Sequence, residues 1–144
     1  MAVGVVAFPL LPLITRPNLW SSRLRRHRPT NHQVIEELKP GLNEMVLPKT
    51  SSSVFNSTNI DFILRSMNKR YLILAGCVTD QCVAHAVMDA CDMGYMVTLV
   101  PEATATYSQQ RQDAALEAIK GYCRMRSVEE LALELLQPAV AAPS

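Results

Sequence analysis

Two cysteines with different surroundings lie within the short stretch GCVTDQCV (residues 76–83). This stretch directly follows the apolar run YLILA, and in an open α/β sheet functional sites form where strands end. Cys82 falls in the first turn of the helix expected next, where unpaired backbone N–H groups and the helix dipole stabilise a thiolate. The same N–H groups can stabilise an oxyanion. Cys82 is therefore a candidate nucleophile, although a cysteine at a helix start can also be inert.

The other three cysteines favour a structural interpretation. Cys77 ends an apolar strand, Cys91 belongs to an apolar helix stripe, and Cys123 lies in a weak edge strand. The four cysteines contain no C-x-x-C pair and His is scarce near them, so we do not expect a zinc site. We also expect no other metal and no cofactor. A disulfide framework is also not expected in a chain this rich in ordinary core residues.

A nucleophilic cysteine needs an activating partner, and Lys49 is the candidate. It follows the predicted short strand EMVLP (residues 44–48), at another expected strand end. A cation close to Cys82 would favour the thiolate. The alternative interpretation of Lys49 is a solvated loop lysine.

The elements that must position these residues follow an alternating pattern. Continuous apolar runs predict buried strands, and stripes at helical spacing with capping residues predict helices. Thr79 or Asp80 is the expected N-cap of the helix that follows YLILA, Gly94 is expected to end that helix, and Ser127 with Glu130 is expected to form a capping box before the last helix. Strands are expected at 44–48, 71–75, 95–100 and, weakly, at 123–126; helices are expected to end at 34–38 and to cover 59–67, 79–93, 108–119 and 127–137. The alternation is typical of an α/β fold, with a parallel sheet flanked by helices on both faces.

The N-terminal part of the chain differs in composition from the rest. Residues 1–32 are Pro-interrupted, acid-free and Arg-bearing, which is typical of an organelle transit peptide, a disordered tail or an aberrant exon. We therefore expect an irregular segment at 1–32, one domain at 33–137 and a frayed tail at 138–144. The formal net charge of +1 and the absence of an 18-residue apolar run favour neither nucleic acid nor membrane as a partner.

Three motifs in order resemble the isochorismatase-like cysteine hydrolases, a family that includes nicotinamidases, N-carbamoylsarcosine amidohydrolases and ureidoacrylate amidohydrolases. The resemblance runs from about Gln33 to Leu136 and is carried by LPKTSSSVF, YLILAGCVTDQCV and MDACDMGYMVTLVPEATAT. It implies a Rossmann-like three-layer fold and a triad in which Cys82 is the nucleophile and Lys49 the lysine. It also implies a cis peptide at Cys77–Val78 and an oxyanion hole formed by the N–H groups of Val78 and Cys82. The implied reaction is hydrolysis of a C–N bond in a small amide or ureido substrate through a Cys thioester.

The sequence departs from the family at the third member of the triad. The family places an Asp at the end of its first strand, but this sequence has no Asp before Asp61. We therefore expect the first strand to be missing. Three alternatives stay open: a truncated form of an active enzyme, an impaired paralogue acting as a binding or regulatory subunit, or a base supplied by Glu36, Glu37 or Glu44. We expect a homo-oligomer in the cytoplasm, or in an organelle if the N-terminal segment is a transit peptide.

Overall fold

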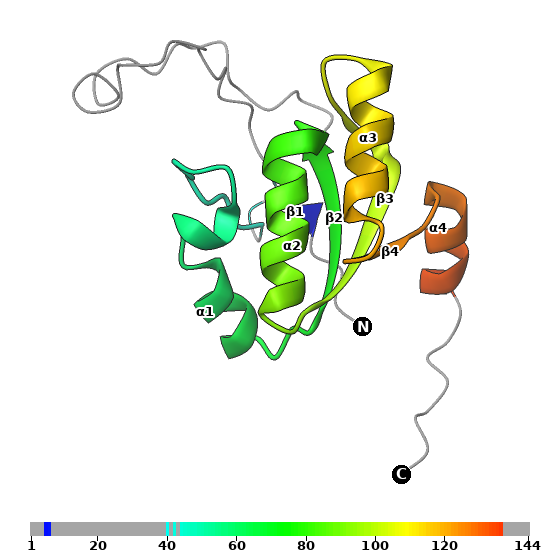
Figure 1. Cartoon of the computed structure of the whole chain (residues 1–144). Helices are drawn as coiled ribbons and strands as arrows, with labels where there is room; N and C mark the ends of the chain where they lie inside the picture. Colours follow the sequence, from blue (N-terminus) through cyan, green and yellow to red (C-terminus); the bar gives the residue numbers. More distant parts are fainter. Residues whose placement is uncertain (1–4, 7–39, 41, 43, 137–144) are drawn as a thin grey trace, which may run out of the picture. The chain divides into compact units, whose positions relative to one another are not determined.

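The sheet contains four strands, all parallel, in the spatial order β1-β2-β3-β4 (Figure 1). The computed structural model describes residues 5–6, 40, 42 and 44–136 of the 144 in the chain. The strands are β1 (Val5–Val6), β2 (Tyr71–Cys77), β3 (Met96–Ala105) and β4 (Arg124–Met125). A parallel sheet needs helical crossovers between its strands, and the order of elements supplies one after each of β2 and β3.

Helices flank this sheet, as the sequence predicts. In Figure 1, α2 and α3 lie beside each other over the sheet, and α4 lies near β4. The helical segments are η3 (Val54–Asn56), α1 (Ile60–Ser66), η4 (Thr79–Val83), α2 (Ala84–Asp92), α3 (Gln109–Ile119) and α4 (Val128–Leu136). Within the described residues, none of these helices is long and apolar enough to cross a bilayer.

The core forms where β2 and β3 meet α2. Leu72 pairs with Val97 and Leu74 with Leu99, and these four side chains are buried. The helix contributes the predicted stripe at helical spacing, of which Val83, Ala86, Val87 and Ala90 are at most 1% exposed. The apolar runs of the two strands therefore fix the layer on which the following helix packs.

The end of α2 is specified locally by Gly94. Gly94 has φ +85°, a left-handed conformation that favours glycine. Its N–H donates to Cys91 O at 2.9 Å, and the Tyr95 N–H donates to Ala90 O at 2.9 Å. This pair of bonds is a Schellman motif, which satisfies the last carbonyls of the helix and turns the chain into β3.

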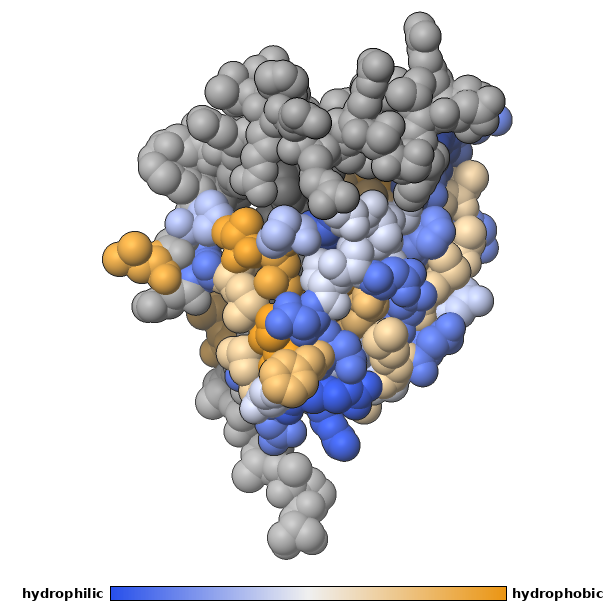
Figure 2. Space-filling model, turned by 90° about the vertical axis from the view of Figure 1, so that its left-hand side faces the viewer, coloured by the Kyte–Doolittle hydropathy of each residue, from blue (hydrophilic) through white to orange (hydrophobic). Residues whose placement is uncertain are grey.

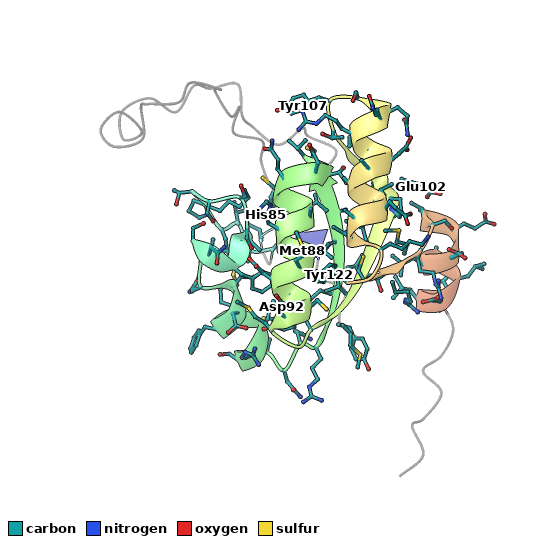
Figure 3. The ribbon with its side chains drawn as sticks, viewed as in Figure 1. His85, Met88, Asp92, Glu102, Tyr107 and Tyr122 are labelled. Atoms are coloured by element: carbon teal, nitrogen blue, oxygen red, sulfur yellow. The ribbon has the colours of Figure 1, made fainter. Side chains whose placement is uncertain are left out.

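The starts of α3 and α4 are also specified by local side chains. Ser108 Oγ accepts from the Arg111 N–H at 3.3 Å. At α4, Ser127 Oγ accepts from Glu130 N–H at 3.1 Å, and Glu130 Oε2 accepts from Ser127 N–H at 2.9 Å. This reciprocal pair is the predicted capping box. The carboxylate of Glu102 on β3 adds a bond from Val128 N–H at 2.8 Å (Figure 3).

Two strand predictions differ from the structure. The strand expected at 44–48 does not form, and Met45 and Val46 are more than half exposed. An apolar run becomes a strand only if a neighbour completes its hydrogen bonds, and Pro48 has no N–H to offer. Conversely, β3 continues past residue 100 to Ala105, because a register shift between Leu74 and Gly76 allows Gly76 to pair with Thr104.

The sheet also begins earlier in the chain than expected. The sequence predicts irregular structure at 1–32 and a missing first strand, but β1 forms a two-residue parallel pair with β2, in which Val5 aligns with Ile73 and Val6 with Leu74. Two β-branched valines suit such a pairing. The predicted helix end at 34–38, the frayed tail at 138–144 and the rest of residues 1–32 lie outside the described residues.

Figure 2 views the side of the molecule that carries η3 and α1, where hydrophobic and hydrophilic side chains are interspersed. Phe62 and Met67 of α1 are 71% and 56% exposed. Ile60 is the buried residue of this helix. Polar groups hold both ends of this helix, since the Tyr95 hydroxyl donates to Asp61 Oδ1 at 2.7 Å and Arg65 Nη2 donates to Met93 O at 3.1 Å.

Candidate active site

The candidate site begins where β2 leaves the sheet. Gly76 has φ +125°, a conformation that side-chain-bearing residues rarely adopt, and it lies at the register shift in the pairing with β3. The next peptide bond, Cys77–Val78, is cis. This is the bond for which the family resemblance implies that geometry. The Cys77 thiol is half-buried, and burial, with a smaller contribution from the charge of Cys82, raises its pKa.

Cys82 lies in η4, a π-helical turn that runs directly into α2. Single π turns of this kind are frequent at functional sites. The Val78 carbonyl accepts from the N–H groups of Gln81 and Val83, at 3.1 and 3.3 Å, which begins the helix immediately after the cis bond. The Cys82 side chain is half-buried and therefore accessible from one side.

The structure brings Lys49 to Cys82, although the two residues are 33 positions apart. Lys49 Nζ lies 3.2 Å from Cys82 Sγ and donates a second hydrogen bond to Ser51 O at 2.9 Å. An ammonium at this distance stabilises the charged form of a thiol. Lys49 is half-buried, so water screens the pair less than it would two fully exposed groups.

Asp80 faces the opposite side of the same turn, toward the segment between β3 and α3. Thr106 Oγ1 donates to Asp80 Oδ1 at 2.5 Å, and Arg111 donates to Asp80 Oδ2 through Nε at 2.7 Å and also through Nη2. Burial alone would raise the pKa of Asp80, but these hydrogen bonds outweigh it and hold the pKa below its usual value. The Arg111 guanidinium also lies 5.1 Å from the ring centre of Tyr107, near the start of α3 (Figure 3).

These contacts correct the predicted start of the helix. The sequence favours Thr79 or Asp80 as the capping residue, but the N-cap is Val78, with no side-chain capping bond. The Asp80 carboxylate binds Thr106 and Arg111 instead, so it fastens the turn that bears Cys82 to the start of α3. A carboxylate held in this way, with its pKa lowered, is a poor general base.

Comparison with known proteins places this chain in a family. The model of the isochorismatase domain matches residues 15–130 of the chain. The chain belongs to the isochorismatase family. The match begins well before Gln33, where the motif resemblance begins, and it includes both Lys49 and Cys82.

Among curated relatives, ureidoacrylate amidohydrolase RutB of Agrobacterium fabrum (strain C58) is 32% identical over 74 residues. The match covers 51% of this chain and 32% of that protein. RutB of Rhizobium rhizogenes (strain K84) is also 32% identical over 74 residues, which are 30% of its length. The chain therefore matches about a third of the curated relatives' length.

Solved structures show the same fold. The nicotinamidase/pyrazinamidase PncA of Bacillus subtilis is 30% identical, with a TM-score of 0.53 over 55% of this chain and 44% of its own. An isochorismatase-like hydrolase of Alkaliphilus metalliredigens is 23% identical, with a TM-score of 0.70 over 72% of this chain and 57% of its own. The isochorismatase-like α/β fold, a parallel sheet with flanking helices, follows from these matches.

Among the described residues, we assign no carboxylate as the third member of the family triad. Glu36 and Glu37 lie outside them, Glu44 is exposed, and Asp80 is engaged by Thr106 and Arg111. Within the described residues, no cluster of three or more His, Cys, Asp or Glu side chains could hold a metal ion.

Sequence reasoning missed the polar side chains that support the site. Thr106 and Arg111 bind the Asp80 carboxylate from 26 and 31 residues away along the chain, and no local sequence pattern predicts such pairs. Ser57 Oγ accepts hydrogen bonds from the N–H groups of Thr50 and Ser51, the two residues that follow Lys49. The run TSSS after Lys49 was the available signal, because serines at close spacing often bind nearby backbone groups.

Proposed function

We propose that this chain uses Cys82 as the nucleophile of a C–N hydrolase, with Lys49 as the cation that activates it. The observation that carries the proposal is the 3.2 Å contact between Lys49 Nζ and Cys82 Sγ at the start of a helix on the sheet. A thiolate there meets two stabilising influences: the lysine charge and the dipole of the helix that starts at this turn.

The reaction proceeds in two steps. In the first, the Cys82 thiolate attacks the carbonyl carbon of a small amide or ureido compound. A C–S bond forms, the C–N bond breaks, and ammonia or an amine leaves with a proton. In the second, water attacks the thioester, so that the C–S bond breaks and the carboxylic or carbamic acid is released with the thiol restored. The N–H groups of Val78 and Cys82 are assigned to the oxyanion that develops in each step.

The proposed substrate class is inferred from the compounds for which the relatives are named. RutB is named for ureidoacrylate, and the Bacillus subtilis protein is named as a nicotinamidase/pyrazinamidase. Both names describe hydrolysis of a C–N bond in a small molecule. We propose substrates of the same class for this chain, without a choice between the ureido and the aromatic amide.

The test is the release of ammonia from ureidoacrylate and from nicotinamide by the full chain. We expect turnover that falls to the uncatalysed level in Cys82→Ala and by about 10²–10⁴-fold in Lys49→Ala, the usual scale for loss of a group that assists proton or charge movement. Cys123→Ala is the matched control, because it removes a half-buried thiol that is not part of the proposed machinery. Turnover that survives in Cys82→Ala, or no turnover of either compound, would contradict the proposal.

A further inference from the structure

The Lys49 ammonium contacts a backbone carbonyl and the Cys82 sulfur. Its Nζ donates to Ser51 O at 2.9 Å and lies 3.2 Å from Cys82 Sγ. A lysine stem loses rotamer freedom when it is fixed, so a fixed ammonium needs support from its surroundings. The Ser51 carbonyl can direct Nζ toward the sulfur only if the backbone around Ser51 is itself held in place. What holds that backbone is therefore part of how the pair is formed.

Ser57 holds it directly. Ser57 Oγ accepts from the Thr50 N–H at 3.1 Å and from the Ser51 N–H at 3.2 Å. A hydroxyl has two acceptor lone pairs and one proton, so these two bonds fill the accepting capacity of Ser57. One side chain thus satisfies two consecutive N–H groups of a loop, immediately after the lysine.

The proton of Ser57 also has a defined place. Ser51 Oγ lies 3.0 Å from Ser57 Oγ and 2.5 Å from Ser53 O. Ser51 has one hydroxyl proton, and its shorter contact directs that proton to Ser53 O. The Ser57 hydroxyl then donates to Ser51 Oγ. The chain of bonds from Ser57 through Ser51 to Ser53 O uses each proton once, which fixes both serine rotamers.

The neighbouring hydroxyls serve different groups. Ser53 Oγ accepts from Phe55 N–H at 3.2 Å, which caps η3. Thr58 Oγ1 donates to Val54 O at 2.7 Å and accepts from Ile60 N–H at 3.2 Å, at the start of α1. Both stabilise short helical segments. The bonds of Ser57 reach instead to the two residues after Lys49, and the carbonyl of the second, Ser51, accepts from the Lys49 ammonium.

We propose that Ser57 is a positioning residue for Lys49, acting through the backbone of Thr50 and Ser51 to keep the ammonium on the Cys82 sulfur. The inference rests on the proposed pairing of Lys49 with Cys82. Without the Ser57 hydroxyl, the two N–H groups lose their acceptor, the loop relaxes, and the Ser51 carbonyl no longer directs Nζ. Cys82 then loses part of the charge that stabilises its thiolate.

The test measures the rate at which iodoacetamide labels Cys82 near neutral pH in the full chain. Cleavage before Asp residues releases residues 80–88, a peptide in which Cys82 is the only cysteine. Ser57→Thr and Ser57→Val form a matched pair, because they have the same shape and differ in the hydroxyl. We expect Ser57→Val and Ser57→Ala to label about fivefold more slowly than wild type, and Ser57→Thr to label at close to the wild-type rate.

The lysine variant separates positioning from a general effect on folding. In a Lys49→Ala background, where labelling is already slow, replacing Ser57 by Val should have no further effect. Ser108→Ala is the control for the loss of a capping hydroxyl elsewhere, at the start of α3, and should label at the wild-type rate. Melting curves of each variant show whether it is folded during labelling.

Each outcome bears on one claim. If Lys49→Ala slows labelling but Ser57→Val does not, the positioning role is overturned and the Lys49–Cys82 pair stands. A Ser57→Thr variant as slow as Ser57→Val, or an undiminished effect of Ser57→Val in the Lys49→Ala background, also overturns it. If Lys49→Ala labels as fast as wild type, the pairing itself fails, and the proposed function with it.

Discussion

The contact of Arg111 with Asp80 should contribute measurably to stability, because it fastens the turn that bears Cys82 to α3. Asp80 is 20% and Arg111 45% exposed at the side chain. A pair this exposed is screened by water and typically contributes 0–1 kcal/mol. The Arg111 contact uses two guanidinium nitrogens on one carboxylate oxygen, and Thr106 fixes the other oxygen. We therefore expect Arg111→Met to lower the free energy of unfolding by about 1 kcal/mol, near the upper end of that range.

Thermal unfolding followed by circular dichroism is a suitable assay. For a chain of this size, a loss of about 1 kcal/mol lowers Tm by roughly 4 °C. The double-mutant cycle of Arg111→Met with Asp80→Asn should give a coupling energy of about 0.5–1 kcal/mol. Lys120→Met is the control on the same helix, since Lys120 pairs with Glu117 at 3.5 Å with both side chains highly exposed, and it should change stability by less than about 0.5 kcal/mol.

The contribution of the Arg111–Asp80 pair to stability should depend on pH in a defined direction. The folded-state pKa of Asp80 is lowered below its ordinary value of 3.8. Its ionic contribution is therefore present above the unfolded-state pKa and is lost as the pH falls through the folded-state pKa. The difference between wild type and Arg111→Met should be smaller at pH 3 than at pH 7. An equal difference at both pH values, or a coupling energy of zero, would refute the assigned role of the pair.

Two further predictions concern the scaffold. Leu99→Ala should lower the free energy of unfolding by about 3 kcal/mol in denaturant titrations, because this side chain on β3 is fully buried; a loss under about 1 kcal/mol would contradict the assigned core. Burial, and then the bond to Asp61, raises the pKa of Tyr95 to about 12. Its neutral form therefore stabilises the fold up to the unfolded-state pKa near 10, and that contribution is lost as the pH rises toward 12. Raising the pH from 11 to 13 should add tyrosinate absorbance in wild type that Tyr95→Phe lacks, and identical increments would count against the Tyr95–Asp61 bond.

Local signals predicted much of the fold. Gly94 ends α2, and Ser127 with Glu130 starts α4, because each device acts within a few residues of its own position. The apolar runs of β2 and β3 predicted strands of a parallel sheet, and the structure confirms them. These features depend on neighbours along the chain, which a sequence displays directly.

Features that depend on partners distant in the sequence were harder to predict. The strand expected at 44–48 failed because pairing, not apolar character, makes a strand. Asp80 looked like a helix cap, yet Thr106 and Arg111 bind its carboxylate. Lys49 was a candidate because it follows an expected strand and because the family resemblance implies it, but no spacing rule predicts its contact with Cys82, which is 33 positions away.

Trapping the thioester tests the central claim most directly. The full chain would be mixed with excess ureidoacrylate or nicotinamide, quenched in acid within its first turnovers, and cleaved before Asp residues for mass spectrometry. We predict an acyl adduct on residues 80–88, which contain Cys82, and no adduct in Cys82→Ala. Product formation without that adduct, or an adduct on the peptide that contains Cys77, would contradict the assignment of Cys82 as the nucleophile.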